Sequence, residues 1–163
     1  MKYDDASRHY GGDFPSDLPN EAGATHIGMF VAWALLNGLP GEVHTDEFPE
    51  DLKRLKSREI TPGQFLITAC DEKFTDEDLN DEGNAFTQAY FDLQTGKYLT
   101  DYESILGANV PSLYYVPDTW ESFDKLSPII KERFLQWKSG ELETSDLPSS
   151  GASTEDKPWW KFW

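Results

Sequence analysis

The sequence predicts an all-α or mostly α protein, a single compact helical domain. Its 163 residues suit one domain, and six Trp, seven Tyr and ten Phe supply large side chains for a core. Several segments combine apolar residues at helical spacing with a capping residue at the start, which is typical of helices. A small β-hairpin around residues 90–102 is the main alternative to an all-helical chain.

The first predicted helix follows an irregular arm. Residues 1–23 contain adjacent glycines and two prolines, so no helix is expected there. The next segment, THIGMFVAWALLNG, begins with Thr25 as a cap and ends with Gly38 as a left-handed stop. Its apolar residues surround the whole helix, which is typical of a helix at the centre of a domain. Gly28 and Ala32, four residues apart, would let a second helix approach closely.

Two short helices are predicted next. The segment FPEDLKRLKS places three apolar side chains on an inward face: Phe48, Leu52 and Leu55. The segment TPGQFLITACDEKF has clear start signals, because Thr61 is a cap, Pro62 fits the first turn and Gln64 completes a capping box. Its buried side is expected to continue as far as Phe74.

The acidic segment TDEDLNDEGNAFTQAYFD is predicted to form one further helix. Thr75 serves as its cap, and Asp78, three residues later, approximates a capping box. An inward stripe then follows helical spacing: Leu79, Gly83, Phe86 and Tyr90.

The last part of the domain is predicted from shorter signals. Residues 96–107 favour a helix, with a strand as the alternative, and residues 112–116 suggest a short extended piece. Asp118 and Glu121 resemble a capping box for another helix, which Pro128 is expected to restart.

Composition divides the chain into three parts. The helical domain covers residues 1–140, a polar flexible linker covers 141–157, and the aromatic tail PWWKFW covers 158–163. Four tail residues are expected to dock on an apolar groove: Trp159, Trp160, Phe162 and Trp163. A groove on the domain itself, or on a second copy in a homodimer, is the favoured acceptor. A partner protein and a membrane interface are the alternatives.

Charge limits the classes of partner. The chain carries 30 acidic and 14 basic residues, a formal net charge of −16. Such a field repels nucleic acid and anionic membranes and attracts basic proteins. The lone Cys70 cannot form an internal disulfide, the N-terminus lacks a signal-peptide core, and the apolar run 27–36 is too short to cross a bilayer. We therefore expect a cytoplasmic protein that contacts neither nucleic acid nor membrane directly.

The densest acidic run, residues 71–82, holds seven carboxylates and raises the question of calcium. Three of its residues match the first ligand positions of an EF-hand loop: Asp76, Asp78 and Asn80. The sixth position of such a loop needs glycine and the twelfth needs glutamate, but this chain has Asp81 and Thr87 there. A calcium loop is therefore not favoured.

Enzyme chemistry has little support in the sequence. On a helix most carboxylates of the acidic run face water, where they titrate normally. Glu82 flanks the buried face and is the exception, so a hydrolase or metal enzyme would use Glu82 with a histidine. The three histidines are scattered and lack metal-ligand spacing: His9, His26 and His44. We expect no enzyme, no metal and no cofactor.

A basic partner protein explains the acidic run best. The helix dipole stabilises the carboxylates of residues 76–78 in a first turn, but it disfavours Asp71 and Glu72 at the end of the preceding helix. Fold stability does not require the latter two, whereas a basic partner would. The predicted partner-binding residues are Asp71, Glu72, Glu77, Asp78, Asp81, Glu82 and Asn84.

Three stretches carry a family resemblance: YDDASRHYGGDFP, ATHIGMFVAWALLNGL, and the run EFPEDLKRLKSREITPG through CDEKFTDEDLNDEGNAF. With SLYYVPDTWESFDKL they cover roughly residues 1–140. They resemble a bacterial family of small acidic proteins encoded near polymorphic toxin and type VI secretion genes, where they act as immunity proteins. The resemblance implies a cognate toxin with a basic surface. A nuclease is the natural candidate, because an acidic surface can occupy a phosphate-binding groove. An adaptor or chaperone that loads an effector is a further alternative.

Overall fold

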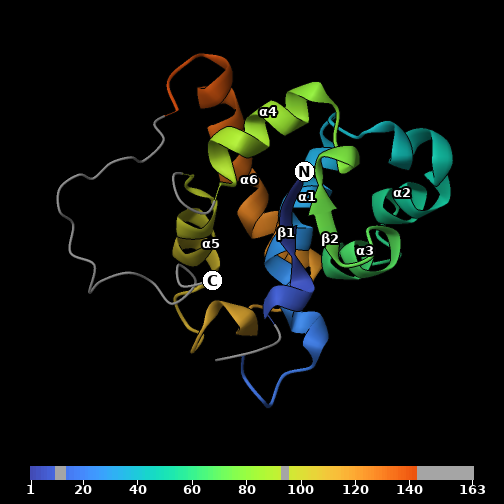
Figure 1. Ribbon diagram of the computed structural model, residues 1–163. Coiled ribbons are helices and arrows are strands. Elements are labelled where there is room, and N and C mark those ends of the chain that lie inside the picture. The colour runs from blue at the N-terminus through green and yellow to red at the C-terminus, as the bar shows by residue number, and fades with distance from the viewer. Residues whose placement is uncertain (10–13, 93–95, 143–163) are drawn as a thin grey trace.

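The computed structural model describes residues 1–9, 14–92 and 96–142, which form a mostly α-helical domain (Figure 1). The α-helices are α1 (Thr25–Leu36), α2 (Pro49–Lys56), α3 (Pro62–Ala69), α4 (Asp81–Tyr90), α5 (Tyr98–Leu106) and α6 (Trp120–Lys138). Single turns of 3-10 or π helix are η1 (Ala6–His9), η2 (Asn20–Ala24), η3 (Val43–Glu47), η4 (Asp76–Asp78) and η5 (Leu113–Tyr115). The strands are β1 (Lys2–Asp5) and β2 (Lys73–Thr75). The predicted fold class is confirmed.

Helix α1 lies at the centre of the domain, as its apolar sequence predicts. Every residue from Thr25 to Leu35 is buried. Gly28 allows α3 to approach, because a Cβ atom there would lie 2.4 Å from the carbonyl oxygen of Pro62. Gly38 follows the helix with a φ of 85°, which confirms the predicted left-handed stop. The predicted cap is wrong: Thr25 is already helical, and Ala24 holds the capping position without a side-chain hydrogen bond.

Aromatic side chains join the other elements to α1. The ring centroid of Phe30 on α1 lies within 6.1 Å of the centroids of five other rings. They are Phe74 of β2, Phe86 and Tyr90 of α4, Phe91 directly after α4, and Tyr98 of α5. These rings meet in tilted or edge-to-face geometry, which the quadrupoles of aromatic rings favour. The core is therefore organised around one phenylalanine of the central helix.

The strands β1 and β2 form an antiparallel pair beside α1 (Figure 1). Asp4 is the partner of Phe74, and Asp5 is the partner of Lys73. The prediction of an irregular arm is therefore wrong for residues 2–5. A four-residue strand shows too little periodicity to be recognised when its partner lies so far along the chain. The alternative hairpin around residues 90–102 is also wrong, since α4 ends at Tyr90 and α5 begins at Tyr98.

The acidic segment forms two elements, not the single helix that the sequence predicts. Thr75 and Asp78 make the expected capping box, but around the short turn η4. The chain then becomes extended at Leu79, and Asn80 caps α4 by accepting a hydrogen bond from Gly83 N at 2.8 Å. Two capping residues five positions apart can each start a helix, and here both do so.

Helix α6 is continuous, so the predicted restart at Pro128 is wrong. Buried side chains on both sides of the proline hold the helix against the core: Phe123, Leu126 and Ile130. Packing of one apolar face outweighs the lost backbone hydrogen bond at the proline. Half-buried Phe134 and Trp137 extend this face, as expected.

The predicted cap of α6 is also wrong. Thr119 caps the helix by accepting a hydrogen bond from Ser122 N at 3.1 Å. The Asp118 carboxylate instead accepts hydrogen bonds from Gly63 N at 2.8 Å and from the Thr61 hydroxyl at 2.5 Å. Asp118 therefore joins the segment before α6 to the start of α3.

Other local predictions differ in outcome. Helices α2 and α5 form where expected, and α3 begins where expected with the capping box of Thr61 and Gln64. The predicted continuation of α3 to Phe74 is wrong, because the helix ends at Ala69 and Phe74 lies in β2. Phe48, expected to face inward, is 57% exposed because α2 begins only after it, at Pro49. Residues 112–116, expected to be extended, contain the turn η5.

No helix within the described residues is long and apolar enough to cross a membrane.

Residues 143–163 lie outside the described residues. They include most of the predicted linker and the four predicted docking residues: Trp159, Trp160, Phe162 and Trp163.

Candidate functional site

The acidic run 71–82 extends over the end of α3, β2, η4 and the start of α4. The predicted partner-binding residues divide by exposure. Exposed are Asp71, Glu77 and Asp81; half-buried are Glu72, Glu82 and Asn84; buried is Asp78. The run therefore does not offer all seven side chains to a partner.

Asp78 must be removed from the predicted binding surface. Its Oδ1 lies 2.8 Å from His44 Nε2, and its Oδ2 accepts a hydrogen bond from Thr75 N at 2.8 Å. Both oxygens are used inside the domain, where only 6% of the residue is exposed. In a capping box the third residue of the turn accepts a hydrogen bond from the backbone of the capping residue, here Thr75, so its side chain is turned inward. The prediction of one exposed helix placed Asp78 on the outer surface instead.

Glu82 and Asn84 also have structural contacts. Glu82 forms an ion pair with Lys138 of α6, and no histidine contacts it among the described residues. Asn84 accepts a hydrogen bond from the Tyr3 hydroxyl at 2.7 Å and donates one to the Asp76 carbonyl at 2.9 Å. The combination of Glu82 with a histidine that the enzyme alternative required is therefore not formed.

Asp71 and Glu72 follow α3 in an unusual backbone conformation. Their φ angles are 55° and 68°, in the left-handed region that favours glycine. Hydrogen bonds from Glu72 N to Leu66 O at 3.0 Å and from Ala6 N to Glu72 O at 2.8 Å stabilise this turn. The side chain of Asp71 is 94% exposed, and Lys73 lies 3.4 Å from it.

Two acidic segments meet on one side of the domain. Gly41 N donates a hydrogen bond to Asp78 O at 3.0 Å, and Asn80 N donates one to Leu39 O at 2.9 Å. A Cβ atom at Gly41 would lie 2.5 Å from the Glu77 carbonyl oxygen, so only glycine permits this close contact. The segment between α1 and α2 is thus fixed against η4.

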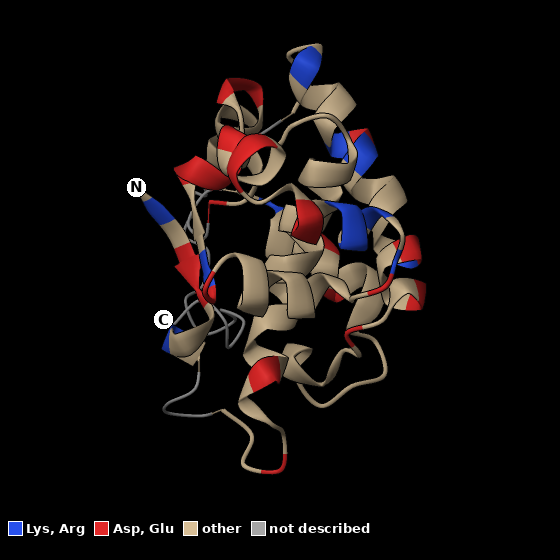
Figure 2. Ribbon diagram, turned by 90° about the vertical axis from the view of Figure 1, so that its right-hand side faces the viewer, with Lys and Arg blue, Asp and Glu red and all other residues tan. Residues whose placement is uncertain are grey.

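Asp76 of η4 pairs with the N-terminal amine. The six other exposed carboxylates of these two segments and of the adjoining first turns of α2 and α4 are called the acidic face below: Glu42, Asp46, Glu47, Glu50, Glu77 and Asp81. Within residues 1–9, 14–92 and 96–142, no lysine or arginine forms an ion pair with any of them. In Figure 2, acidic positions dominate the upper part of the molecule on the side of the N-terminus. The uncompensated charge is available to a basic partner.

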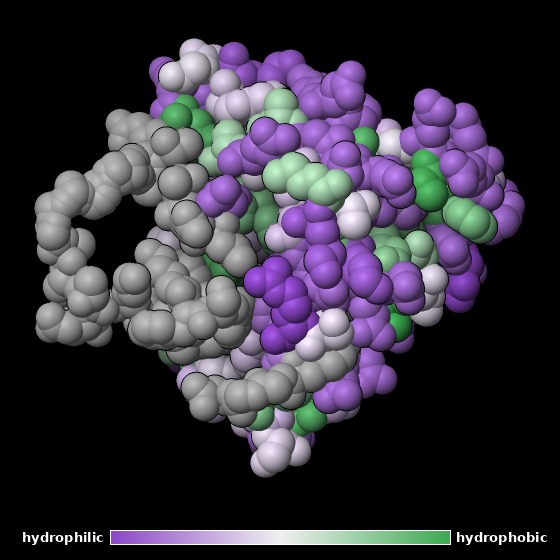
Figure 3. Space-filling view, in the orientation of Figure 1, coloured by the Kyte–Doolittle hydropathy of each residue, from purple (hydrophilic) through white to green (hydrophobic). Residues whose placement is uncertain are grey.

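Phe48 supplies an apolar side chain within the acidic face. It lies between Glu47 and Glu50 and is 57% exposed. Figure 3 shows a predominantly hydrophilic surface with small, separate apolar areas. An exposed aromatic ring surrounded by charges is typical of the anchor residues of protein interfaces.

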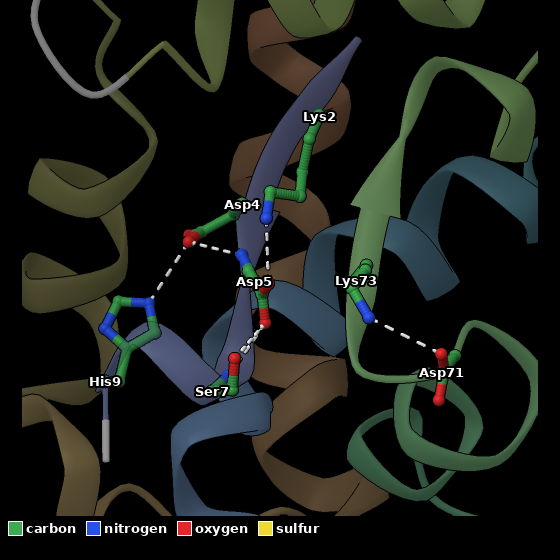
Figure 4. Close-up of polar contacts among 7 residues, drawn as sticks. All are labelled: Lys2, Asp4, Asp5, Ser7, His9, Asp71 and Lys73. Atoms are coloured by element: carbon green, nitrogen blue, oxygen red, sulfur yellow. Dashed lines mark hydrogen bonds and ion pairs between the residues drawn. The ribbon is translucent and has the colours of Figure 1, made fainter. Parts of the chain in front are cut away.

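The interior holds a cluster that the sequence spacing did not indicate: Asp4, His9 and His26. His9 Nε2 lies 3.2 Å from Asp4 Oδ1, and His26 Nε2 lies 3.6 Å from Asp4 Oδ2. The two imidazole rings meet edge to face with centroids 4.8 Å apart. Figure 4 shows the Asp4 carboxylate on β1 between the His9 ring and the backbone nitrogen of Asp5, which donates a hydrogen bond to Oδ1 at 2.8 Å. Strand β1, turn η1 and helix α1 each contribute one residue.

Burial and hydrogen bonding set the charges in this cluster. Burial alone would raise the pKa of Asp4, but interactions with His26 and His9 outweigh it and hold the pKa well below its ordinary range. Burial lowers the pKa of His26, and Asp4 offsets only part of that effect. The carboxylate is therefore ionised, and His26 is neutral at neutral pH.

The third histidine lies in a second buried cluster with Asp78 and Cys70. His44 Nε2 lies 2.8 Å from Asp78 and 3.9 Å from Cys70 Sγ. The same nitrogen faces both groups, so His44 cannot act as a base between the thiol and the carboxylate. Burial raises the pKa of the Cys70 thiol, and Asp78 raises it further. The cluster therefore lacks an activated nucleophile.

A shallow groove of about 380 Å³ lies beside this cluster. Its lining combines apolar carbon with two cationic side chains: His44, Thr45, Pro49, Leu52, Lys53 and Lys56. The lysines mark the border of the acidic face on α2.

Sequence reasoning missed both the acidic segment before α2 and the histidine clusters. For the acidic segment, the apolar spacing from Phe48 onward predicts only a helix with an inward face. The four carboxylates between residues 42 and 50 were a usable signal of an acidic surface. The second depends on pairing of β1 with β2 and on packing against α1, which no local pattern reveals.

Comparison with known proteins gives a family and nothing more specific. The profile of a domain of unknown function (DUF7832) matches residues 2–116, which include β1 to η5. No curated protein and no solved structure matches the chain. The matched region contains the acidic face and both buried clusters.

Proposed function

The chain belongs to the DUF7832 family, and for this member we propose a function in protein binding: it neutralises a basic partner protein by covering the partner's functional surface. The partner is an antibacterial toxin of the type that the sequence resemblance implies, and neutralisation takes place in the cytoplasm. A nuclease fits best, because the groove that binds its substrate phosphates is basic.

One observation carries the proposal, namely the acidic face with Phe48 inside it. Six exposed carboxylates on two segments lack ion pairs within the described part of the chain, and the aromatic ring among them is more than half exposed. Charges of this kind steer association and set specificity, whereas an aromatic anchor contributes most of the affinity. The two features together suit a basic protein surface with an apolar pocket.

Backbone contacts support the same function. Hydrogen bonds between residues 39–41 and 78–80, and the 2.8 Å contact between His44 Nε2 and Asp78 Oδ1, fix the acidic segments before a partner arrives. A fixed surface loses little conformational entropy on binding. Such preorganisation favours a tight complex over a transient one.

The test is co-expression with the protein encoded by the neighbouring gene. We expect the cell to survive, and the two proteins to copurify at low salt with an affinity that falls as salt increases. Phe48→Ala should weaken binding at least tenfold, and so should the triple variant Glu42→Lys, Glu47→Lys and Glu77→Lys.

A matched control reverses three exposed acids elsewhere, Glu59→Lys before α3, Glu103→Lys on α5 and Glu132→Lys on α6. The control should bind like the natural protein. If both variants lose the same amount of affinity for the partner, the effect is one of net charge and not of the acidic face. Cell death despite a folded protein would contradict neutralisation. If instead the cell survives without the protein but the neighbouring protein is no longer exported, the chain is a loading adaptor.

A further inference from the structure

The cluster of Asp4, His9 and His26 has the composition and spacing of a metal site. Three nitrogen or oxygen atoms converge from separate elements, and all lie within 4.8 Å of one another. In a tetrahedral zinc site with bonds of about 2.0–2.1 Å, neighbouring ligand atoms are about 3.3 Å apart. His9 Nε2 lies 3.2 Å from Asp4 Oδ1 and His26 Nε2 lies 3.6 Å from Asp4 Oδ2, so each histidine approaches a different oxygen of the carboxylate at a distance close to this value.

The longer distance cannot be explained as a hydrogen bond. At 3.6 Å, Asp4 Oδ2 and His26 Nε2 are too far apart for one, and Oδ2 has no other hydrogen-bond partner among the described residues. A buried carboxylate oxygen normally has a partner, because leaving it without one costs about 1–3 kcal/mol. A cation held between the three side chains would satisfy it.

The surroundings of His9 meet a second requirement of metal sites. Its Nδ1 lies 2.9 Å from the hydroxyl of Tyr114, while its Nε2 faces Asp4. Metal-binding histidines usually use the second ring nitrogen for a hydrogen bond that fixes the orientation of the ring. Tyr114 performs this role from η5, far from His9 in the sequence.

We propose that Asp4, His9 and His26 bind a divalent transition metal ion, with zinc as the best fit. Two imidazole nitrogens and one carboxylate suit zinc, whereas calcium and magnesium prefer sites made only of oxygen. The side chains of His9 and Asp4 are 0% and 1% exposed and that of His26 is 5% exposed, so substrate has no access to the ion. The metal is structural and ties β1 and η1 to the central helix.

The remaining contact of the carboxylate agrees with this assignment. Asp4 Oδ1 accepts a hydrogen bond from Asp5 N at 2.8 Å, which fixes the orientation of the carboxylate as Tyr114 fixes that of the His9 ring. This inference does not depend on the identity of the protein partner.

The second cluster is the natural competitor for the same metal. His44, Cys70 and Asp78 also converge, but the distance of 2.8 Å between His44 and Asp78 is that of an ordinary hydrogen bond. His44 Nδ1 is buried and has no hydrogen-bond partner among the described residues, so the ring lacks the orienting contact that Tyr114 gives His9. The first cluster is therefore the better site, and the thiol of Cys70 makes the two distinguishable.

The experiment uses the full-length chain, stripped with a chelator and supplied with zinc alone or cobalt alone. We expect one zinc ion per chain by mass spectrometry of the metal, and a melting temperature that rises with zinc and falls again with the chelator. Cobalt should give tetrahedral visible bands without a thiolate charge-transfer band. In NMR spectra of the cobalt form, the imidazole signals of His9 and His26 should shift strongly and those of His44 should not.

Variants provide an independent check. His26→Gln should lose stoichiometric zinc, and the matched control His44→Gln should retain it. If His26→Gln does not fold, the cobalt spectra of the natural chain still decide the question. A thiolate band that Cys70→Ser removes would move the metal to the second cluster, and less than a tenth of an equivalent of zinc in the folded natural chain would exclude the site. Either result overturns the proposal.

Discussion

Arg133 on α6 binds Asp101 on α5 through two nearly parallel hydrogen bonds, from Nε at 2.8 Å and from Nη2 at 3.0 Å. The hydroxyl of Tyr90 donates a third hydrogen bond to the same carboxylate at 2.7 Å. The side chain of Asp101 is only 9% exposed, so these donors take the place of water around its carboxylate. One carboxylate thus joins α4, α5 and α6.

Replacing Arg133 should therefore destabilise the domain. Arg133→Met leaves a buried carboxylate without a cation, and we expect the free energy of unfolding to fall by about 3 kcal/mol in urea denaturation. The control is Asp124→Asn, which removes an exposed ion pair with Arg58 and should cost less than about 1 kcal/mol. Similar losses for both variants would mean that Asp101 is better solvated than its burial implies.

A methyl group at Gly28 should separate α1 from α3. The added Cβ would lie 2.4 Å from the Pro62 carbonyl oxygen, and backbone cannot move aside cheaply. We expect Gly28→Ala to reduce the free energy of unfolding by about 3 kcal/mol. At Gly38 a Cβ meets nothing within 4 Å, so Gly38→Ala should lose only about 1 kcal/mol, from its positive φ. Thermal unfolding of both variants tests the difference.

Charge reversal should destabilise the protein strongly at Asp78 and hardly at all at the adjacent Glu77. Asp78→Lys puts a cation beside His44 and breaks the cap at Thr75, so we expect a loss of at least about 3 kcal/mol or an unfolded chain. Glu77→Lys changes an exposed side chain and should alter stability by no more than about 0.5 kcal/mol. Circular dichroism during urea titration measures both. A stable Asp78→Lys protein would restore Asp78 to the binding surface.

Glycine should be tolerated, or even preferred, where Asp71 stands. Its φ of 55° costs a non-glycine residue about 1 kcal/mol, and its exposed side chain contributes little through the 3.4 Å contact with Lys73. We expect Asp71→Gly to leave the melting temperature unchanged or higher, and Asp71→Val to lower it. Because Asp71→Gly also removes a predicted binding carboxylate, its effect on partner affinity can be measured without loss of stability.

The thiol of Cys70 should react slowly in the folded protein. Burial and the neighbouring Asp78 raise its pKa above the ordinary value, so almost no thiolate exists near neutral pH. We expect alkylation by iodoacetamide at pH 7 to be at least tenfold slower than in the urea-unfolded chain. Alkylation should become faster in Asp78→Asn, which removes the charge that raises the pKa most after burial. Rapid modification of the folded natural chain would contradict the raised pKa.

Local signals in the sequence predicted much of the helical part. The capping box at Thr61 and the left-handed stop at Gly38 depend on neighbours within a few positions, and the structure confirms both. The pair of small residues Gly28 and Ala32 indicated a close helix contact, and the approach of α3 to Gly28 confirms it. Errors arose where two local signals competed. Thr75 and Asn80 can both cap a helix. The sequence pattern predicts one long helix from Thr75, whereas the structure has η4 after Thr75 and α4 after Asn80.

The candidate sites were harder to predict because they depend on distant residues. His9 reaches His26 only after β1 pairs with β2, and neither strand is long enough to show alternation. Phe48 was assigned to a helix face that begins one residue later. The acidic character of the surface was evident from composition, but the division into buried and exposed carboxylates was not.

The pairing of β1 with β2 has a consequence for synthesis on the ribosome. Residues 2–5 leave the exit tunnel about 4–14 seconds before their partners, residues 73–75, at usual translation rates. During that interval Asp4 and His9 have no sheet to hold them beside α1. The domain therefore completes its core late in translation, and a nascent chain interrupted before residue 73 exposes the apolar helix that the finished protein conceals.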